Sequence, residues 1–144
     1  MAFINQFVSE QSVPGLFLVA IAIAAILVYV PFGVVGYGRL VVGYDSTQPR
    51  ALFDKLPPYA QRATWAHENG FESLAFFTPA ALMAYVTGQS STVALGAAIA
   101  YLIARLLYPL FYILNIPTLR SLMFGVANIG VFTLFFLSCR TALF

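Results

Sequence analysis

Two charged side chains lie near the middle of largely apolar segments, and they are the residues best placed to do chemistry. Glu72 falls within residues 61–87 and Arg105 within residues 91–114. A lone charge at the centre of a bilayer costs roughly 2.5–3.5 kcal/mol on insertion scales. Each charge therefore needs a partner or a ligand, and intramembrane charges of this kind mark functional sites.

The two charges are expected at the same depth in the membrane. At 1.5 Å per residue, Glu72 lies ~17 Å along its helix from Gln61, and Arg105 lies ~17 Å from Ile116 at the same membrane face. Removing either charge would then leave the other without its partner. An alternative is a buried Glu72–Arg105 pair that only fixes the register of the two helices.

Further polar and aromatic residues follow the same two helices. If the helices are antiparallel neighbours, Asn69 faces Tyr108 and Trp65 faces Tyr112 by the same count of rise per residue. Arg62 shares a helical stripe with Asn69, at a spacing of i and i+7. These residues predict a polar ladder that reaches inward from one membrane face.

His67 and Arg120 stand apart from this ladder. His67 points about 140° away from Arg62 on an ideal helix, so a ligand or acid–base role and a simple hydrogen-bonded histidine both remain open. Arg120 follows Pro117 near the start of the last apolar segment. Free backbone N–H groups and the helix dipole favour an anion there, so a thiolate or carboxylate would be stabilised.

The composition restricts the chain to the membrane class. Hydrophobic residues make up 61% of its 144 positions and charged residues only 8%, far from the balance of soluble domains. The net charge of +2 is too small and scattered for a nucleic-acid surface. With Cys139 and His67 as the single cysteine and histidine, we expect no intrachain disulfide and no metal site, and an inert Cys139.

The expected fold is all-α: one integral membrane four-helix domain over residues 1–144. We expect the spans to occupy residues 13–38, 61–87, 91–114 and 118–139, arranged as two hairpins. The first span is too long for a signal peptide and is read as retained. Gly96-Ala97-Ala98 predicts a close helix-packing surface. The only kink expected is at Pro109.

Basic residues predict the orientation in the membrane. Arg140 alone lies near the opposite face from the five that flank the first and third connections, namely Arg39, Arg50, Lys55, Arg62 and Arg120. The positive-inside rule therefore places these two connections in the cytoplasm and both termini outside it. By this rule Arg39, Arg50 and Lys55 read as ordinary cytoplasmic charges rather than ligand contacts.

Two motifs resemble those of the MAPEG family, the membrane-associated proteins in eicosanoid and glutathione metabolism. One is Arg62-Ala63-Thr64-Trp65-Ala66-His67-Glu68-Asn69-Gly70-Phe71-Glu72. The other is Ala104-Arg105-Leu106-Leu107-Tyr108, followed by Tyr112 and Arg120. The segment 117–121 resembles that of small bacterial members, which suggests a bacterial inner membrane.

The resemblance implies a homotrimer that binds glutathione between subunits. By position, the residues implied to contact glutathione are Arg62, His67, Asn69, Glu72, Arg105, Tyr108 and Tyr112, with Arg39 reaching in from a neighbouring subunit. Arg120 would face the sulfur. Two positions depart from the family, since Trp65 stands where an arginine is frequent and Ser73 where leukotriene C synthases carry tyrosine.

The function expected from these observations is a glutathione-dependent transferase or peroxidase. Arg120 would lower the thiol pKa, and the thiolate would attack a lipophilic electrophile from the bilayer. The alternative is a non-catalytic membrane protein of the same fold that binds glutathione or a lipid, or modulates other membrane proteins. A channel or transporter fits less well, since there is no inverted repeat and no break beyond Pro109.

Overall fold

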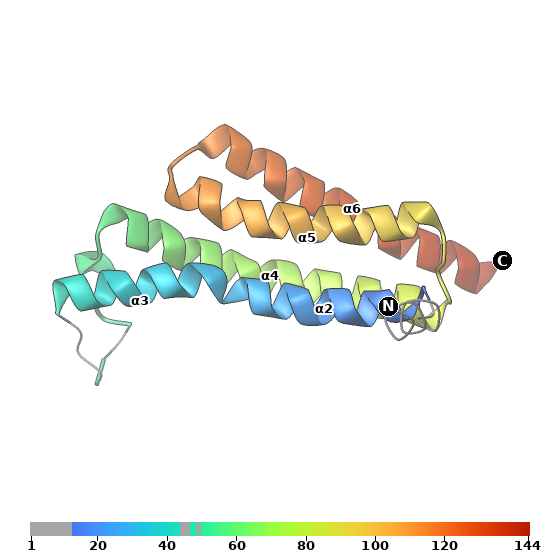
Figure 1. The fold of residues 1–144 in the computed structure, drawn as a ribbon, viewed down its shortest axis with the longest axis horizontal. Coiled ribbons are helices and arrows are strands. Elements are labelled where there is room, and N and C mark those ends of the chain that lie inside the picture. The colour runs from blue at the N-terminus through green and yellow to red at the C-terminus, as the bar shows by residue number, and fades with distance from the viewer. Residues whose placement is uncertain (1–12, 44–46, 49) are drawn as a thin grey trace, which may run out of the picture.

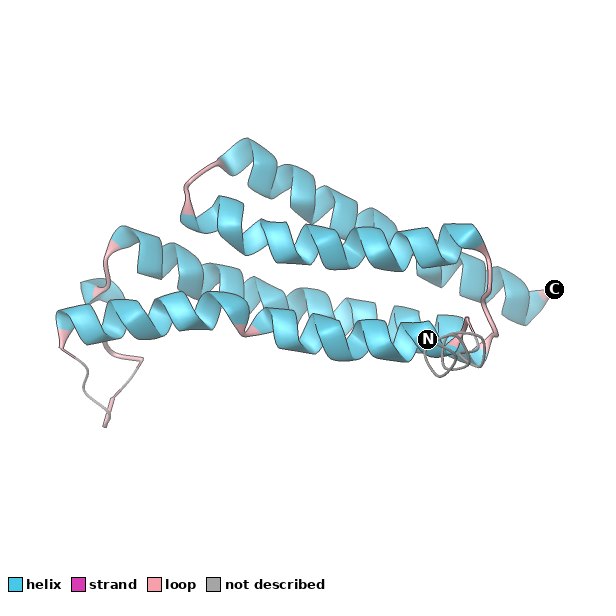
Figure 2. Ribbon diagram, in the orientation of Figure 1, coloured by secondary structure: helices cyan, strands magenta, loops and turns pink. Residues whose placement is uncertain are grey.

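The computed structural model describes residues 13–43, 47–48 and 50–144. Two antiparallel helical hairpins pack side by side (Figure 1). The described residues form helices and loops without a strand (Figure 2). The elements are α2 (Gly15–Val28), α3 (Val30–Val42), a 3-10 turn η1 (Phe53–Lys55), α4 (Pro58–Val86), α5 (Thr92–Ile113) and α6 (Pro117–Leu143). The expected all-α bundle of two hairpins is confirmed.

The first span is interrupted near Tyr29, where α2 ends and α3 begins. Pro31 is the reason, because proline carries no N–H and leaves the carbonyl of Leu27 without its helical donor. The carbonyl of Val28 instead accepts from the Nδ1–H of His67, at 2.7 Å. The expectation of no break beyond a kink at Pro109 was therefore wrong for the first span, whereas Pro109 lies inside the continuous helix α5.

Several helices extend beyond their expected ends. α3 continues to Val42, α4 already begins at Pro58, and α6 runs on to Leu143. Proline fits the first position of a helix, where no backbone N–H is needed, so Pro58 begins α4 rather than belonging to the loop. The first connection is consequently shorter than the expected 39–60.

Three helical segments are apolar and long enough to cross a membrane: Gly15–Val42, Thr92–Ile113 and Pro117–Leu143. The fourth, α4, has 29 residues but is more polar. Small residues dominate the side of α4 that packs against the other helices, with Ala63, Ala66 and Gly70 among those buried. The longer polar side chains of α4 lie on its other sides.

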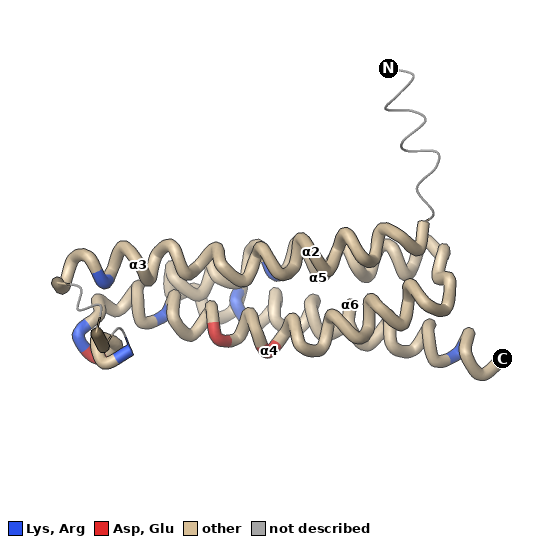
Figure 3. Tube along the Cα trace, turned by 90° about the horizontal axis from the view of Figure 1, so that it is seen from below, with Lys and Arg blue, Asp and Glu red and all other residues tan. Residues whose placement is uncertain are grey.

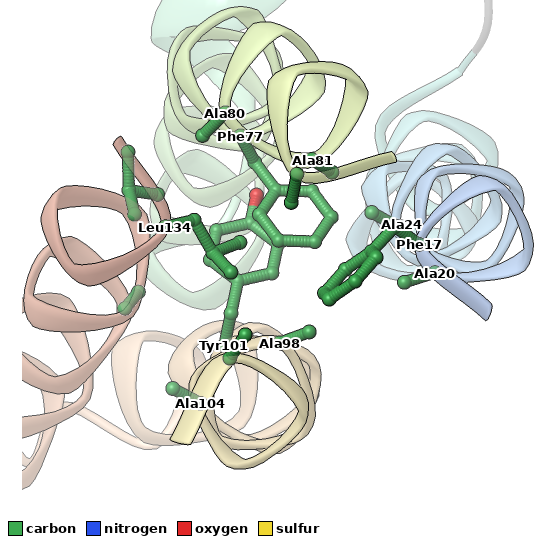
Figure 4. Packing of buried hydrophobic residues seen from close by; sticks show 14 residues of the cluster. Phe17, Ala20, Ala24, Phe77, Ala80, Ala81, Ala98, Tyr101, Ala104 and Leu134 are labelled. Carbon is green, nitrogen blue, oxygen red and sulfur yellow. The ribbon is translucent and has the colours of Figure 1, made fainter. Parts of the chain in front are cut away.

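The core is built mainly from alanines with a few large rings between them (Figure 4). Phe77 of α4 and Tyr101 of α5 stack with ring centroids 3.7 Å apart and planes inclined by 3°. Phe17 of α2 and Leu134 of α6 are fully buried against the same cluster. Small side chains let the helices approach closely, as helix association in a lipid solvent requires.

The helices α5 and α6 approach each other closely in this core. A Cβ atom added at Gly130 would lie 2.7 Å from the carbonyl oxygen of Ala97. Ala98 is also buried, whereas Gly96 has open space around it. The predicted packing surface is therefore confirmed at Ala97 and Ala98 but not at Gly96.

The first connection and the α5–α6 turn lie at one end of the bundle, and the α4–α5 turn lies at the other (Figure 1). Most lysines and arginines gather toward the first of these ends (Figure 3). The α5–α6 turn is made by Asn115, whose φ of 59° ends α5 before Pro117 begins α6. The expected grouping of the connections by membrane face agrees with this arrangement.

Candidate functional site

Asn69 joins the buried Arg105 to the exposed Glu72. Its Oδ1 accepts a hydrogen bond of 3.0 Å from the guanidinium of Arg105. Its Nδ2 donates to Glu72 Oε2, also at 3.0 Å. Arg105 and Glu72 are thus linked through the amide of Asn69 and lie at similar depth, as expected. The two charges do not form a direct ion pair.

An open groove runs along α4, α5 and α6 and contains most of the predicted ladder. It consists of three adjoining hollows of about 400, 280 and 130 Å³, which share lining residues with one another. The side chains along it are Trp65, Glu68, Asn69, Glu72, Ser73, Phe76, Tyr108, Tyr112, Arg120, Ser121, Phe124, Asn128 and Val131. The groove thus combines carboxylate, amide, phenol and guanidinium groups with an apolar end.

Aromatic contacts order the half of the groove nearest the α5–α6 turn. Trp65 and Tyr112 lie with ring centroids 6.4 Å apart, as the depth count predicted. Tyr108 meets Tyr112 edge to face at 5.6 Å. The guanidinium carbon of Arg120 lies 4.8 Å from the centre of the Tyr112 ring. Arg120 of α6 is thereby held over the Tyr112 ring of α5 and lines the same space.

Arg105 supports the groove but does not line it. Only 7% of its surface is exposed, and its guanidinium carbon lies 4.6 Å from the centre of the Tyr108 ring. Through Asn69 and Tyr108 it holds two groove residues in place. Its predicted direct contact with glutathione stays a prediction, and the geometry of the subunit assigns it a positioning role.

Arg62 turns away from the ladder to a helix end. Its Nε donates a 3.0 Å hydrogen bond to the carbonyl of Ile113, the last residue of α5. That carbonyl belongs to the orphan acceptors that every helix end leaves. Arg62 therefore ties α4 to α5 beside the groove rather than lining it.

His67 lies on the opposite side of α4, at the break in the first span. Besides bonding to Val28, its ring contacts Tyr29, Phe32 and Phe71, with centroids 5.7, 5.1 and 5.0 Å away. The hydrogen bond agrees with the reading of His67 as a hydrogen-bonded histidine. His67 also lines a cavity on this side of α4 together with Arg39, so its ligand role stays a prediction.

Several groove residues were not predicted from the sequence. Ser73 Oγ lies 3.1 Å from the hydroxyl of the buried Tyr101. Ser73 stands where leukotriene C synthases carry tyrosine, and here it hydrogen-bonds to a tyrosine hydroxyl of another helix. On α6, Ser121, Phe124 and Asn128 all line the groove. Their spacing of i, i+3 and i+7 repeats the spacing seen on α4, and this signal in the sequence could have identified them.

The bundle, its apolar segments and its intramembrane polar groove define a multi-span integral membrane protein with a potential binding site for a polar ligand. The model of the MAPEG family matches residues 16–140, nearly the whole chain, and the chain belongs to that family. No curated protein and no solved structure matches it.

Proposed function

We propose that the protein is a glutathione-dependent transferase or peroxidase acting on lipophilic electrophiles. The observation that carries this proposal is the placement of the Arg120 guanidinium and the Glu72 carboxylate along one continuous groove. Family membership supports the same reading, because the family is associated with glutathione metabolism. The ligand would bring a thiolate and an ammonium group to these two charges.

The groove residues fit the polar groups of glutathione. Glu72 is exposed, and its carboxylate retains acceptor capacity beyond the bond from Asn69, so it can receive the amine of the ligand. Tyr108 and Tyr112 line the groove and would offer their hydroxyls to the peptide groups. The Asn69 amide keeps one N–H and one lone pair beyond its bonds to Glu72 and Arg105. Arg120, in the first turns of α6, is left for the sulfur, where the helix dipole adds to its charge.

The chemical step follows from this arrangement. Arg120 stabilises the thiolate relative to the thiol, so the sulfur gives its proton to solvent water at the open groove before attack. The thiolate sulfur then forms a bond to an electrophilic carbon, and the bond from that carbon to its leaving group breaks with the electron pair departing on that group. An apolar substrate would enter along Phe76, Phe124 and Val131, at the far end of the groove.

A second candidate is a non-catalytic protein of the same fold that binds glutathione or a lipid or modulates other membrane proteins. Trp65 favours it, because an indole provides no cation for a carboxylate of glutathione. Arg62 is not among the residues that line the groove, and its Nε is bonded to Ile113. Arg120 is the only arginine or lysine along the groove in the described part of the chain. Further cations would have to come from a neighbouring subunit. The family resemblance implies this role for Arg39.

One experiment separates the two candidates. The purified full-length protein in detergent is given glutathione and a halonitrobenzene, and conjugate formation is followed against a protein-free blank. Binding of glutathione is measured in parallel by calorimetry. Turnover supports the enzyme, whereas binding without turnover, also with a hydroperoxide as substrate, supports the non-catalytic protein.

A further inference from the structure

The apolar end of the groove contains a polar side chain that the glutathione proposal does not use. Asn128 of α6 lines the hollow of about 130 Å³ at this end. At 1.5 Å per residue, it lies ~17 Å along α6 from Pro117, the first residue of that helix. This depth matches that of Glu72 and falls near the middle of a hydrocarbon core of ~30 Å. A side-chain amide at such a depth is costly unless its polar atoms have partners.

The helix itself satisfies only part of the Asn128 amide. One of its Nδ2 hydrogens is donated to the Phe124 carbonyl at 2.8 Å. An amide group has two such hydrogens, and the second forms no hydrogen bond with the described residues. Asn128 therefore keeps one donor for a molecule that enters the hollow it lines.

Ser73 of α4 brings a second donor to the same hollow. Its Oγ lies 3.1 Å from the hydroxyl of Tyr101, which is buried and bonds to Ser73 within the described residues. Because a buried hydroxyl needs an acceptor for its hydrogen, Tyr101 donates to Ser73. The hydrogen of Ser73 then remains for a ligand. The hollow thus receives one donor from α4 and one from α6.

The other walls select a small, uncharged group with an apolar chain attached. Phe76 and Phe124 are 65% and 47% exposed, so both rings extend from the hollow to the outer surface. A dry cavity of ~150 Å³ holds one benzene molecule, so this smaller hollow takes about five heavy atoms. The carboxylate of Glu72 also lines it and disfavours an anionic group. Phe124 is shared with the hollow of Arg120, so a sulfur held by that guanidinium would lie next to this space.

We propose that the electrophile is a long-chain α,β-unsaturated aldehyde or ketone, whose carbonyl oxygen accepts hydrogen bonds from Asn128 and Ser73. This inference rests on the proposed glutathione-dependent function and names the second substrate of the same groove. The conjugated head consists of three carbons and one oxygen, which the hollow can hold. The alkyl chain would lie along Phe76 and Phe124, toward the bilayer.

The reaction with such a substrate is a conjugate addition without a leaving group. The thiolate sulfur forms a bond to the β-carbon, the electron pair of the C=C bond moves between the α-carbon and the carbonyl carbon, and the carbonyl π pair moves onto oxygen. The two donors stabilise the enolate oxygen that results, as an oxyanion hole does. The α-carbon then takes a proton from water, and the carbonyl re-forms. The ammonium of glutathione would neutralise Glu72 beside this developing charge.

Two electrophiles of equal chain length test this proposal, namely trans-2-nonenal and 1-iodononane, of which only the first has a carbonyl oxygen. The purified full-length protein in detergent receives glutathione and either compound, and conjugates are measured by mass spectrometry against a protein-free blank. Asn128→Leu should lower the ratio of kcat/KM for the enal to kcat/KM for the iodide by about tenfold or more. Most of this loss should appear in kcat, because the donor acts on charge that develops in the transition state. Ser73→Ala should lower the ratio in the same direction.

Thr133→Val is the matched control on α6, because the Thr133 hydroxyl donates to the Ile129 carbonyl at 2.7 Å and does not line the hollow. Its ratio should equal that of the wild type. The enal assignment is overturned, with the transferase function intact, if the wild type conjugates the iodide but not the enal, or if Asn128→Leu keeps the wild-type ratio. Equal loss with both compounds in Asn128→Leu would also overturn it, since Asn128 would then support the fold or a subunit contact. If the wild type conjugates neither compound, the proposed transferase function fails and the enal assignment fails with it.

Discussion

Asn69 has a structural role that neither charged neighbour can take over. Arg105 is almost completely buried, and the Asn69 carbonyl accepts one of its guanidinium N–H groups. The amide nitrogen of the same side chain orients Glu72 toward the groove. The neutral amide of Asn69 thus connects the buried Arg105 to the exposed Glu72. The same side chain therefore stabilises Arg105 and orients Glu72.

Asn69→Ala should lower the free energy of unfolding by about 1–3 kcal/mol, because it leaves a buried guanidinium donor unsatisfied. Thermal unfolding in detergent measures this loss. Asn128→Ala is the matched control, since within the described residues the Asn128 amide bonds to the Phe124 carbonyl one turn earlier in its own helix. Equal melting temperatures for the two variants would contradict the bridging role of Asn69.

Arg120→Ala should slow conjugation by 10²-fold or more while changing glutathione affinity within about an order of magnitude, as expected for lost electrostatic stabilisation. The physical reason is that the anion exists mainly in the activated state. Lowering a thiol pKa by two units requires about 2.7 kcal/mol of differential stabilisation, which is compatible with one guanidinium at a helix start. The ultraviolet thiolate band of bound glutathione should disappear in the variant.

Arg140→Ala is the control for this loss, because it removes an exposed arginine from the other end of α6. Its rate and its thiolate band should equal those of the wild type. Arg120→Lys should retain part of the effect, without the fork geometry of a guanidinium. If Arg120→Ala keeps the thiolate band and the conjugation rate of the wild type, Arg120 contributes only to the orientation of the chain in the membrane.

Counting residues along the helices predicted which side chains lie at the same depth. It did not predict how far each side chain extends and which atoms it contacts. The contact of Trp65 with Tyr112 followed from equal depth alone. The link between Glu72 and Arg105 did not, because the Asn69 side chain reaches between them from one turn away. The bond from Arg62 to Ile113 was equally hidden, since its acceptor is the backbone of a distant helix end.

At the scale of helices, local sequence predicted where spans lie better than where they break. Two prolines inside helices, Pro79 and Pro109, leave α4 and α5 continuous. Pro31 coincides with an interruption, and there the side chain of His67 satisfies a freed carbonyl. The Val28 carbonyl is satisfied by a residue 39 positions away along the chain, so the local sequence alone did not distinguish Pro31 from Pro79 and Pro109.

Gly130→Val should destabilise the α5–α6 pair by about 1–3 kcal/mol or more, as overpacking does in tight cores. The added carbon atoms would overlap the backbone carbonyl of Ala97, and a backbone atom cannot move aside like a flexible side chain. Gly125→Val on the same helix is the control, since a Cβ there meets nothing within 4 Å. If both variants unfold at the same temperature, the close approach of these helices is wrong.

At the scale of the whole molecule, chemical labelling of the single cysteine can test the orientation of the chain in the membrane. Cys139 is free and exposed near the end of α6, opposite the end where basic residues gather. If the positive-inside rule holds, both termini face away from the cytoplasm. A membrane-impermeant maleimide should then label Cys139 in intact spheroplasts, and a Cys139→Ser variant should stay unlabelled. Labelling only after the membrane is opened would reverse the proposed orientation.

The groove also bears on how many copies assemble. Glu72 is exposed in the single subunit although it belongs to the middle of a helix that packs between membrane spans. A carboxylate that faces hydrocarbon is costly, and such residues in membrane proteins face protein or water. A neighbouring subunit that closes the groove would remove this cost and enclose the ligand, as the homotrimer implied by the family resemblance would do.

We therefore expect the purified protein to be a homotrimer by native mass spectrometry. The measurement is made in two detergents of different chain length, so that dissociation by one of them is not taken for the native state. Glutathione should shift the equilibrium further toward the trimer, because a ligand that binds only the assembled groove stabilises it by mass action. A stable monomer or dimer in both detergents, unchanged by glutathione, would show that Glu72 is shielded within one subunit or by lipid headgroups and water.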